Sequence, residues 1–247
     1  MTDPRTARRD AWVSVVIPAL NEADTIARVV GAVPRAIADE VIVVDNGSDD
    51  ATAEQARAVG ARVVREPQRG YGRACAAGAR AVDSRCAVLV FLDGDGSDRP
   101  DLMDRLVAPI LAGDQDFVIG SRVRGRREAG SMGASQVLAA HVAGTLMRLR
   151  YGVRYSDMCP FRAIRRDAFE RLGMREPTYG WNLEMQMRAA ELELRILEVP
   201  VDHRRRAGGT SKVSGTLRGT LAATVRITAT FARVAFGRPR RRPAAAG

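Results

Sequence analysis

The sequence of 247 residues is poor in cysteine, aromatic residues and lysine, and each shortage excludes a class of protein. Its three cysteines, Cys75, Cys86 and Cys159, form no CxxC pair, which argues against a disulfide scaffold or a zinc site and favours a reducing cytosol. Aromatic residues make up only 5% of the chain, too few for a single-strand nucleic-acid binder that stacks bases. Lysine occurs only at Lys212, so arginine supplies almost all of the positive charge.

Long hydrophobic runs are also missing. No window reaches the roughly 20 uninterrupted apolar residues of a membrane span, and the nearest, 217–236, is interrupted by three arginines. The first ten residues are polar, and the apolar run behind them is too short for the core of a signal peptide. We therefore expect a cytoplasmic protein whose contact with a membrane would be peripheral, on the inner face of the plasma membrane.

Hydrophobic residues are plentiful, at 46%, so most of the chain is able to bury a core. The net charge of +10 is distributed unevenly. Residues 1–120 contain 14 arginines against 19 acidic residues, whereas residues 121–247 contain 25 basic against 10 acidic residues. The basic second half predicts a polyanionic partner, which is a phosphate compound, a membrane surface or nucleic acid.

Alternating strands and helices are predicted over the first half. Apolar runs indicate strands, and amphipathic or small-residue segments between them indicate helices. The expected strands are 12–17, 40–45, 62–65, 86–93 and 116–120, and the expected helices are 22–33, 49–59, 71–82 and 100–112. Continuously apolar strands in this order predict an α/β fold with a mostly parallel sheet flanked by helices.

The pattern changes after residue 120. An Arg- and Gly-rich loop comes first, and a polar loop precedes the last helix. The expected elements are a loop at 121–130, a helix at 132–151, a strand at 161–165, a helix at 181–193, a strand at 195–201, a loop at 204–214 and a helix at 217–236.

Polar or acidic clusters follow three of the strong strands, at 18–22, 45–50 and 93–97. Ligands of open parallel sheets bind at the carboxyl ends of the strands, so the three clusters share one edge. One cluster alone, such as 45–50, is also explained by a turn that leads into a helix. Three on one edge indicate a ligand site.

The pair Asp93-x-Asp95 is the most specific of these signals. Two carboxylates just past a buried strand are able to share one hard divalent cation, although an acidic turn is the alternative. Gly94 and Gly96 allow a ligand to approach the backbone closely. The segment 70–73 is only superficially a dinucleotide fingerprint, because its strand is short and is not the first; a tight turn explains it as well.

These segments resemble family 2 glycosyltransferases with the GT-A fold. In the first half the resemblance is carried by Val16–Glu22, Val43–Thr52, Gly70–Ala74 and Phe91–Asp95, in family order. The second half is similar to the branch that contains dolichyl-phosphate mannosyltransferase and bacterial polyprenyl-phosphate glycosyltransferases. Here the carriers are Gly120–Arg122, Ser156-Asp157, Phe161-Arg162, Gly180-Trp181 with Glu184, and Arg204–Lys212.

The resemblance implies a nucleotide-sugar donor bound in a Rossmann-like half. The residues that it assigns to the donor are Pro18, Ala19, Asn21, Glu22, Asp45, Gly72, Arg73, Asp93 and Gly94. It assigns Mg²⁺ or Mn²⁺ on the diphosphate to Asp93, Asp95 and Ser97. Such a cation stabilises the charge of the departing diphosphate, so Asp95 also counts as catalytic.

For the acceptor, the resemblance assigns Ser121, Arg122, Arg206 and Lys212 to an anionic group such as a lipid phosphate, which arginine binds well. An ionised phosphate is already a nucleophile. A hydroxyl acceptor would need a general base, for which Asp157 and Glu184 are candidates; the alternative for each is a structural partner of a nearby arginine.

Two departures from this branch leave the acceptor open. Residues 159–161 read Cys-Pro-Phe where Gly-Phe is expected, and 135–141 lack an arginine that would face the acceptor phosphate. Either the acceptor is not a simple polyprenyl phosphate, or another basic group, such as His141 or His203, replaces that arginine. We expect an inverting, metal-dependent transfer of a hexose from a donor of the UDP-glucose or GDP-mannose type to a polyprenyl phosphate. The alternatives are a soluble or glycan hydroxyl acceptor and a non-catalytic basic module that binds membrane or nucleic acid.

The segment 217–236 has apolar residues at helical spacing, with arginines beside them and four more in 238–242. It predicts an amphipathic helix on an anionic membrane, or a helix that packs on the catalytic domain or on a second subunit as a homodimer.

The expected organisation is a flexible 1–11, a glycosyltransferase domain at 12–214 with its donor half at 12–120 and acceptor half at 121–214, an amphipathic helix at 215–237 and a disordered basic tail at 238–247.

Overall fold

The computed structural model describes residues 11–128, 130–131, 134–206 and 228–236. The expected tail, Lys212, nearly all of the expected flexible N-terminus and most of the expected amphipathic helix lie outside the described residues. No helix of the described part is long and apolar enough to cross a membrane.

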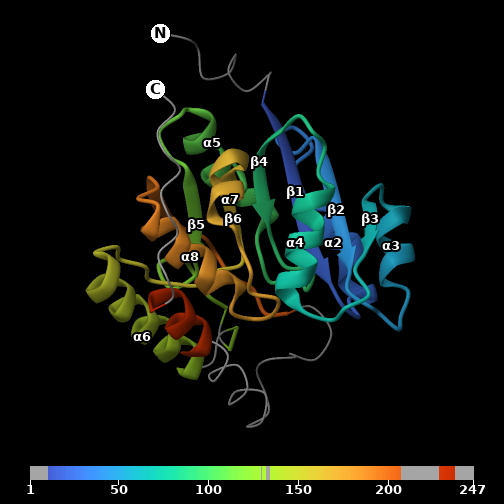
Figure 1. Cartoon of the computed structure of the whole chain (residues 1–247). Helices are drawn as coiled ribbons and strands as arrows, with labels where there is room; N and C mark the ends of the chain where they lie inside the picture. Colours follow the sequence, from blue (N-terminus) through green and yellow to red (C-terminus); the bar gives the residue numbers. More distant parts are fainter. Residues whose placement is uncertain (1–10, 129, 132–133, 207–227, 237–247) are drawn as a thin grey trace.

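A seven-stranded sheet forms the centre of the described structure (Figure 1). Its strands are β1 (Trp12–Ala19), β2 (Glu40–Asp45), β3 (Arg62–Arg65), β4 (Cys86–Phe91), β5 (Phe117–Ser121), β6 (Arg162–Arg165) and β7 (Ile196–Pro200). They lie in the order β3-β2-β1-β4-β6-β5-β7, and only β6 runs antiparallel to its neighbours. The prediction of a mostly parallel α/β sheet is confirmed.

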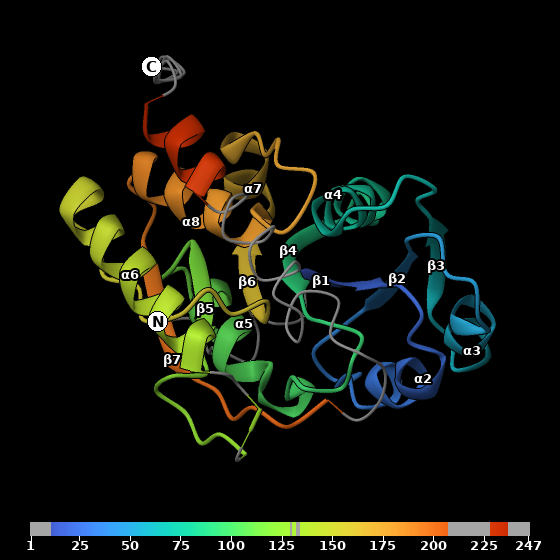
Figure 2. The same cartoon turned by 90° about the horizontal axis from the view of Figure 1, so that it is seen from below.

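Helices cover both faces of this sheet. They are α2 (Ala23–Gly31), α3 (Thr52–Ala58), α4 (Tyr71–Ala81), α5 (Asp104–Leu111) after a 3₁₀ turn at Pro100–Leu102, α6 (Ala134–Tyr151), α7 (Arg166–Leu172) and α8 (Trp181–Glu191). Figure 2 shows α4 and α7 on one side of the strands and α2 and α5 on the other. The sequence did not predict α7, because this helix follows β6 directly and buries only Ala168 and Leu172.

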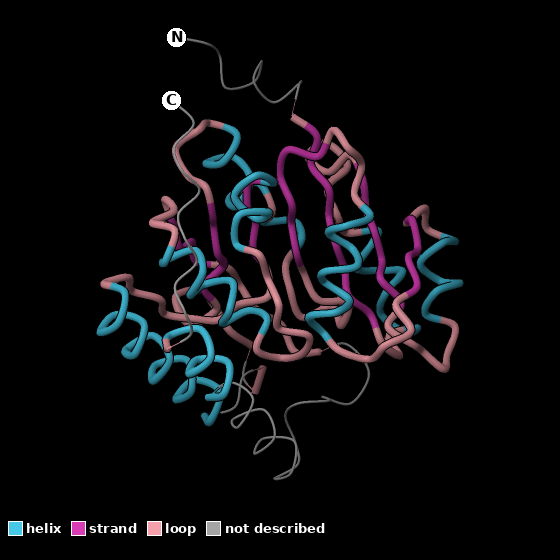
Figure 3. Tube along the Cα trace, viewed as in Figure 1, coloured by secondary structure: helices cyan, strands magenta, loops and turns pink. Residues whose placement is uncertain are grey.

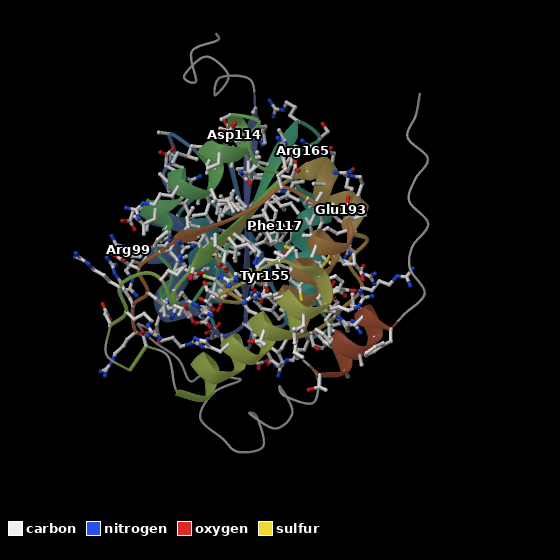
Figure 4. All side chains as sticks on the ribbon, turned by 90° about the vertical axis from the view of Figure 1, so that its left-hand side faces the viewer. Arg99, Asp114, Phe117, Tyr155, Arg165 and Glu193 are labelled. Atoms are coloured by element: carbon white, nitrogen blue, oxygen red, sulfur yellow. The ribbon has the colours of Figure 1, made fainter. Side chains whose placement is uncertain are left out.

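The core is built from strand residues that face the helices. The interior of β1 and β2 is buried, and the small residues of α4 allow that helix to lie directly on them. A Cβ at Gly78 would come within 2.3 Å of Val16 Cγ1, so this position needs glycine. At the other end of the sheet Phe117 is fully buried and central among the side chains, between Arg165 and Tyr155 (Figure 4).

The reversed strand β6 decides which loops meet. Loops after β1, β2, β4 and β5 leave the sheet along one edge, which is the lower edge in Figure 3. Because β6 is antiparallel, the residues before it, 156–161, arrive at that same edge. The polar clusters that follow these strands and the segment 156–161 therefore share one rim.

Candidate active site

The loops after β1 and β2 interlock into one platform. Ala19 pairs with Asp45 in the sheet, and the Ala19 carbonyl accepts a hydrogen bond of 2.9 Å from the Asn46 N–H. Asn21, at a left-handed φ of 52°, receives a bond of 2.9 Å at Oδ1 from the Asp49 N–H. The Glu22 N–H donates to Thr52 Oγ1 at 2.8 Å. Two clusters that are separate in the sequence thus form one surface.

Asn46 fixes the loop that leads to α4. Its Nδ2 donates to the carbonyls of Glu66 and Gln68 at 2.9 and 2.8 Å, and its Oδ1 accepts the Gly70 N–H at 2.7 Å. A Cβ at Gly72 would lie 2.0 Å from the Glu176 carbonyl oxygen. The glycines at 70 and 72 therefore serve a tight turn and close packing, as the simpler interpretation of this segment held.

Arg73 and Gly94 lie at the borders of the platform. Arg73 is exposed and donates from Nη1 to Gln68 Oε1 at 2.6 Å. Gly94 is buried beside the first loop, where its carbonyl accepts a 2.7 Å hydrogen bond from Thr25 Oγ1. Arg73 is thus accessible to a ligand from solvent, whereas Gly94 is buried against the first loop.

Three carboxylates gather after β4. Asp95 Oδ1 accepts hydrogen bonds from the Ser97 N–H at 2.9 Å and hydroxyl at 2.6 Å, and Asp98 Oδ2 accepts the Asp93 N–H at 3.0 Å. Asp93 Oδ1 is buried and has no hydrogen-bond partner. Burial and then repulsion among the three acids raise the pKa of Asp93 and Asp98 above their ordinary values. Asp98 was not predicted as a site residue.

Arg206 occupies one side of this cluster. Its Nε lies 2.8 Å from Asp95 Oδ2, and its Nη1 lies 3.7 Å from Glu22 Oε1. The sequence assigned Arg206 to an acceptor phosphate, and the structure shows it on a donor-side carboxylate. A guanidinium here indicates that the site favours a cation.

We tested whether these residues fit a divalent cation. Within the described ranges, no three His, Cys, Asp or Glu side chains form a metal-binding group. Carboxylate oxygens are nonetheless the ligands that Mg²⁺ and Mn²⁺ prefer, and a cation that also binds a diphosphate needs few protein ligands. The unpartnered Asp93 Oδ1 and the Asp95 oxygen that binds Arg206 fit such an open site. Ser97 donates its hydroxyl to Asp95, so it orients that carboxylate.

The acceptor half contains a buried ion pair. Arg122 donates from Nε and Nη2 to the two Asp157 oxygens, both at 2.8 Å, and Asp157 is 1% exposed. Burial alone would raise the pKa of Asp157 and lower that of Arg122, but their hydrogen bonds outweigh burial and reverse both shifts. Asp157 is therefore a structural partner of an arginine, which is the alternative that the sequence left open.

Glu198 supports this pair and was not predicted. Its carboxylate accepts the Ser156 N–H at 2.9 Å and the Ser156 hydroxyl at 3.0 Å, and the Ser156 and Ser121 hydroxyls are 2.7 Å apart. Ser121 is fully buried, so it contributes to this framework. Nothing in the local sequence around Glu198 distinguishes it from an ordinary strand residue.

The two histidines differ. His141 is exposed on α6, whereas His203 is buried and interacts electrostatically with Arg122, Asp95 and Asp157. Burial lowers the pKa of His203 to about 4, and its Nδ1 has no partner. A neutral imidazole does not supply the positive charge of the arginine that residues 135–141 lack.

Glu184 lies under the segment that precedes α8. Its Oε2 accepts the N–H groups of Arg175 and Glu176 at 2.8 and 2.6 Å, and its side chain is fully buried. Glu176 in turn accepts from Thr230 Oγ1 at 2.9 Å and Arg233 Nη2 at 2.7 Å. These contacts hold the segment 175–178 and the helical residues 228–235 together, and they account for Glu184 without a reacting group.

Comparison with known proteins agrees with this geometry. Residues 14–173 match the sequence model of a family described as glycosyl transferase family 2. The chain is 38% identical over 215 residues to an uncharacterized glycosyltransferase of Mycobacterium tuberculosis, covering 85% of this chain and 94% of that protein. It is 31% identical over 226 residues to polyprenol monophosphomannose synthase of Mycolicibacterium smegmatis, covering 86% and 85%.

Solved structures are similar as well. The Mycobacterium tuberculosis glucosyl-3-phosphoglycerate synthase in complex with Mn²⁺, UDP-glucose and phosphoglyceric acid superposes with a TM-score of 0.75 at 25% identity. The match covers 94% of this chain and 83% of that one.

Proposed function

We propose that this chain transfers a hexose to the phosphate of a polyprenyl phosphate. The proposal starts from its family: the chain belongs to glycosyltransferase family 2 and is a nucleotide-sugar glycosyltransferase with a GT-A fold. The reaction would proceed with inversion at the sugar. The third possibility, a non-catalytic basic module, is set aside by the family.

One observation carries the choice of acceptor: the groups expected to act as general bases are engaged in structural contacts. Asp157 is bound at both oxygens by Arg122, Glu184 binds two backbone N–H groups, and His203 has a pKa of about 4. A hydroxyl acceptor would need a stronger base at neutral pH, whereas an ionised phosphate needs none. The 31% identical polyprenol monophosphomannose synthase supports the same choice.

The donor would lie on the interlocked loops. We assign its nucleoside and diphosphate to Pro18, Ala19, Asn21, Glu22, Asp45, Gly72, Arg73 and Gly94. Asp93 and Asp95, the latter oriented by Ser97, would hold Mg²⁺ or Mn²⁺. When bound, this cation neutralises charge on the leaving nucleoside diphosphate. Arg206 lies within reach of the same charge and would leave Asp95 as the donor enters.

The acceptor phosphate would lie beside Ser121 and Arg122, with Arg206 facing it from the donor side. Lys212, which lies outside the described residues, completes the proposed set. A buried Arg122 whose charge is balanced by Asp157 keeps its guanidinium in a fixed orientation. The ion pair would thus position the acceptor without adding a net charge to the pocket.

Peripheral contact with a membrane fits two exposed surfaces of the acceptor half. Leu149 of α6 is 80% exposed and Phe236 is 82% exposed, and Arg150 contacts the Ala235 carbonyl at 3.4 Å, so the two surfaces are neighbours. Thr230, Val234 and Ala235 are buried, which supports the packing alternative for residues 228–235. We propose that the apolar residues left exposed, with the arginines near them, contact an anionic membrane at the cytoplasmic face; a homodimer through the same surface is the alternative.

The test is a donor panel of UDP-glucose, GDP-mannose, UDP-galactose and UDP-N-acetylglucosamine, each with Mg²⁺ or Mn²⁺ and a short polyprenyl phosphate. We expect one donor to give a hexosyl-phosphate lipid that mass spectrometry identifies. The dephosphorylated polyprenol is the matched control acceptor and is expected to give none. Lack of lipid product with every donor would contradict the proposal.

A second acceptor class is favoured by the absence of an arginine in residues 135–141 and by the structural similarity to a protein solved with phosphoglyceric acid. Phosphoglyceric acid therefore belongs in the same panel. Transfer to its hydroxyl, without transfer to the lipid, would establish a soluble acceptor.

A further inference from the structure

Two buried polar atoms in the first half of the chain lack a partner at hydrogen-bond distance in the described structure, and their residues interact with each other. They are the Tyr71 hydroxyl and Asp93 Oδ1. The phenol is near enough to lower the pKa of Asp93, and Asp93 raises that of Tyr71 after burial has done so. A buried polar atom without a hydrogen bond destabilises the fold, so two on interacting residues need an explanation.

Tyr71 is anchored by the donor loop. It is the first residue of α4 and follows Gly70, whose N–H is held by Asn46 Oδ1 at 2.7 Å. Asp93, in contrast, follows β4, and its backbone N–H is held by Asp98 at 3.0 Å. The phenol therefore connects the start of α4 with a carboxylate of the acidic cluster after β4.

The charges around the pair favour a hydroxyl donor at this place. Asp93 is repelled by Asp95 and Asp98, and the fully buried Arg162 binds carbonyls, at Cys159 and Asn182, without contacting a carboxylate. A carboxylate has two oxygens, and one is sufficient for a cation. The Tyr71 O–H is a neutral donor that already interacts with Asp93 and is able to hold the other.

We infer that Tyr71 is a positioning residue for the metal site: its hydroxyl donates to one Asp93 oxygen when cation and nucleotide are bound, and so turns the other toward the cation. The inference rests on the proposed function only in taking Asp93 as a cation ligand. Partners of metal ligands typically contribute 10–100-fold to metal affinity, which sets the expected effect.

A purely structural tyrosine predicts a different result. If the hydroxyl is only an unsatisfied buried group, Tyr71→Phe removes an unfavourable atom, raises the melting temperature and leaves cation affinity unchanged. If the hydroxyl positions Asp93, the same variant weakens cation binding. The two roles are therefore separated by affinity.

The experiment is a Mn²⁺ titration, followed by the EPR signal of free Mn²⁺, with the full chain in the presence of UDP and, separately, of GDP. We expect Tyr71→Phe to weaken Mn²⁺ binding 10–100-fold, and the Mn²⁺ concentration for half-maximal activity to rise equally while kcat at saturating Mn²⁺ is kept. The matched control is Tyr155→Phe, since the buried Tyr155 hydroxyl donates to the Gln186 carbonyl at 3.0 Å, away from the acids. It should lower stability and leave Mn²⁺ affinity unchanged.

Two further variants keep the outcomes distinguishable. Tyr71→Phe added to Asp93→Asn should cause no additional loss of affinity, because the partner of the hydroxyl is already altered. Unchanged Mn²⁺ affinity in Tyr71→Phe, with a loss in Asp95→Asn, overturns this inference alone. Unchanged affinity in Asp95→Asn as well overturns the metal site of the proposed function, and the inference with it.

Discussion

Two buried carboxylate sites share the rim of the sheet, and they are neutralised in opposite ways. Asp93 and Asp98 are both repelled by the charge of Asp95, Arg206 Nε lies 2.8 Å from Asp95 Oδ2, and Arg122 attracts Asp98. Asp157 is matched oxygen by oxygen with Arg122. Buried carboxylates that repel one another favour binding of a cation, whereas a buried carboxylate with an arginine partner fixes the local structure. The comparison therefore separates a carboxylate suited to binding a ligand from one with a structural role.

The same comparison changes the meaning of the charge asymmetry. Some arginines of the basic second half pair with acids of the first half: Arg206 with Asp95, and Arg195 with Asp116 at 2.9 Å. The excess of arginine is therefore partly internal. Less positive charge is left for a polyanionic partner than the composition indicates.

The largest effect is expected for Asp95→Asn, which removes one negative charge from the cluster of Asp93, Asp95 and Asp98. Transfer should fall on the order of 10³-fold, because a ligand of the charge that stabilises the leaving group is lost. Stability should hold or rise, since repulsion decreases. Initial rates and thermal denaturation measure both, and near-normal activity would contradict the assignment.

The next effect is expected for Asp157→Asn, which breaks the buried ion pair with Arg122. Arg122 is left buried without its partner, so unfolding in urea should show a loss of about 3–5 kcal/mol. The double variant Arg122→Met with Asp157→Leu should recover most of that stability. A variant that is fully stable but inactive would instead restore Asp157 as a general base.

The third effect is a pH dependence of the free energy of unfolding, caused by the buried His203, which interacts with both Asp95 and Asp157. The pKa of His203 is about 4 in the folded chain and about 6.5 when unfolded, so between these values the unfolded state binds the proton. Stability is lost as the pH falls, by about 2 kcal/mol at pH 5 relative to pH 7. Urea unfolding at both pH values measures this, and His203→Gln should remove most of the difference; an equal slope in the variant would refute it.

The smallest effect is expected for Glu198→Gln, which weakens the hydrogen bonds that hold Ser156, the residue before Asp157. The Ser156 N–H and hydroxyl lose a charged acceptor, so unfolding should become easier by about 1 kcal/mol. The KM for the acceptor should rise while the KM for the donor stays constant. A change in the donor KM alone would argue against a role in the acceptor half.

The sequence predicted what is local. Apolar strands and the polar clusters that follow them are visible in neighbouring residues, so the sheet and the shared edge of these clusters were predictable. The direction of β6 was not, because its four residues, Arg162–Arg165, carry no sign of orientation. Arg206 was assigned to the acceptor because its partner, Asp95, is far away in the chain. Glu184 was a candidate general base, but its carboxylate accepts hydrogen bonds from the backbone N–H groups of Arg175 and Glu176, which are distant contacts that the local sequence does not show.

The reversed strand also has a consequence for engineering. β5 and β6 are antiparallel neighbours, so the whole segment 122–161, with α6 in it, is formally one very long hairpin connection. Such a connection is inserted into the sheet at a single point, and its ends are already adjacent. Exchanging the segment between relatives therefore tests the proposed acceptor role: product analysis should show the acceptor preference of the relative that supplied the segment and the nucleotide preference of the host.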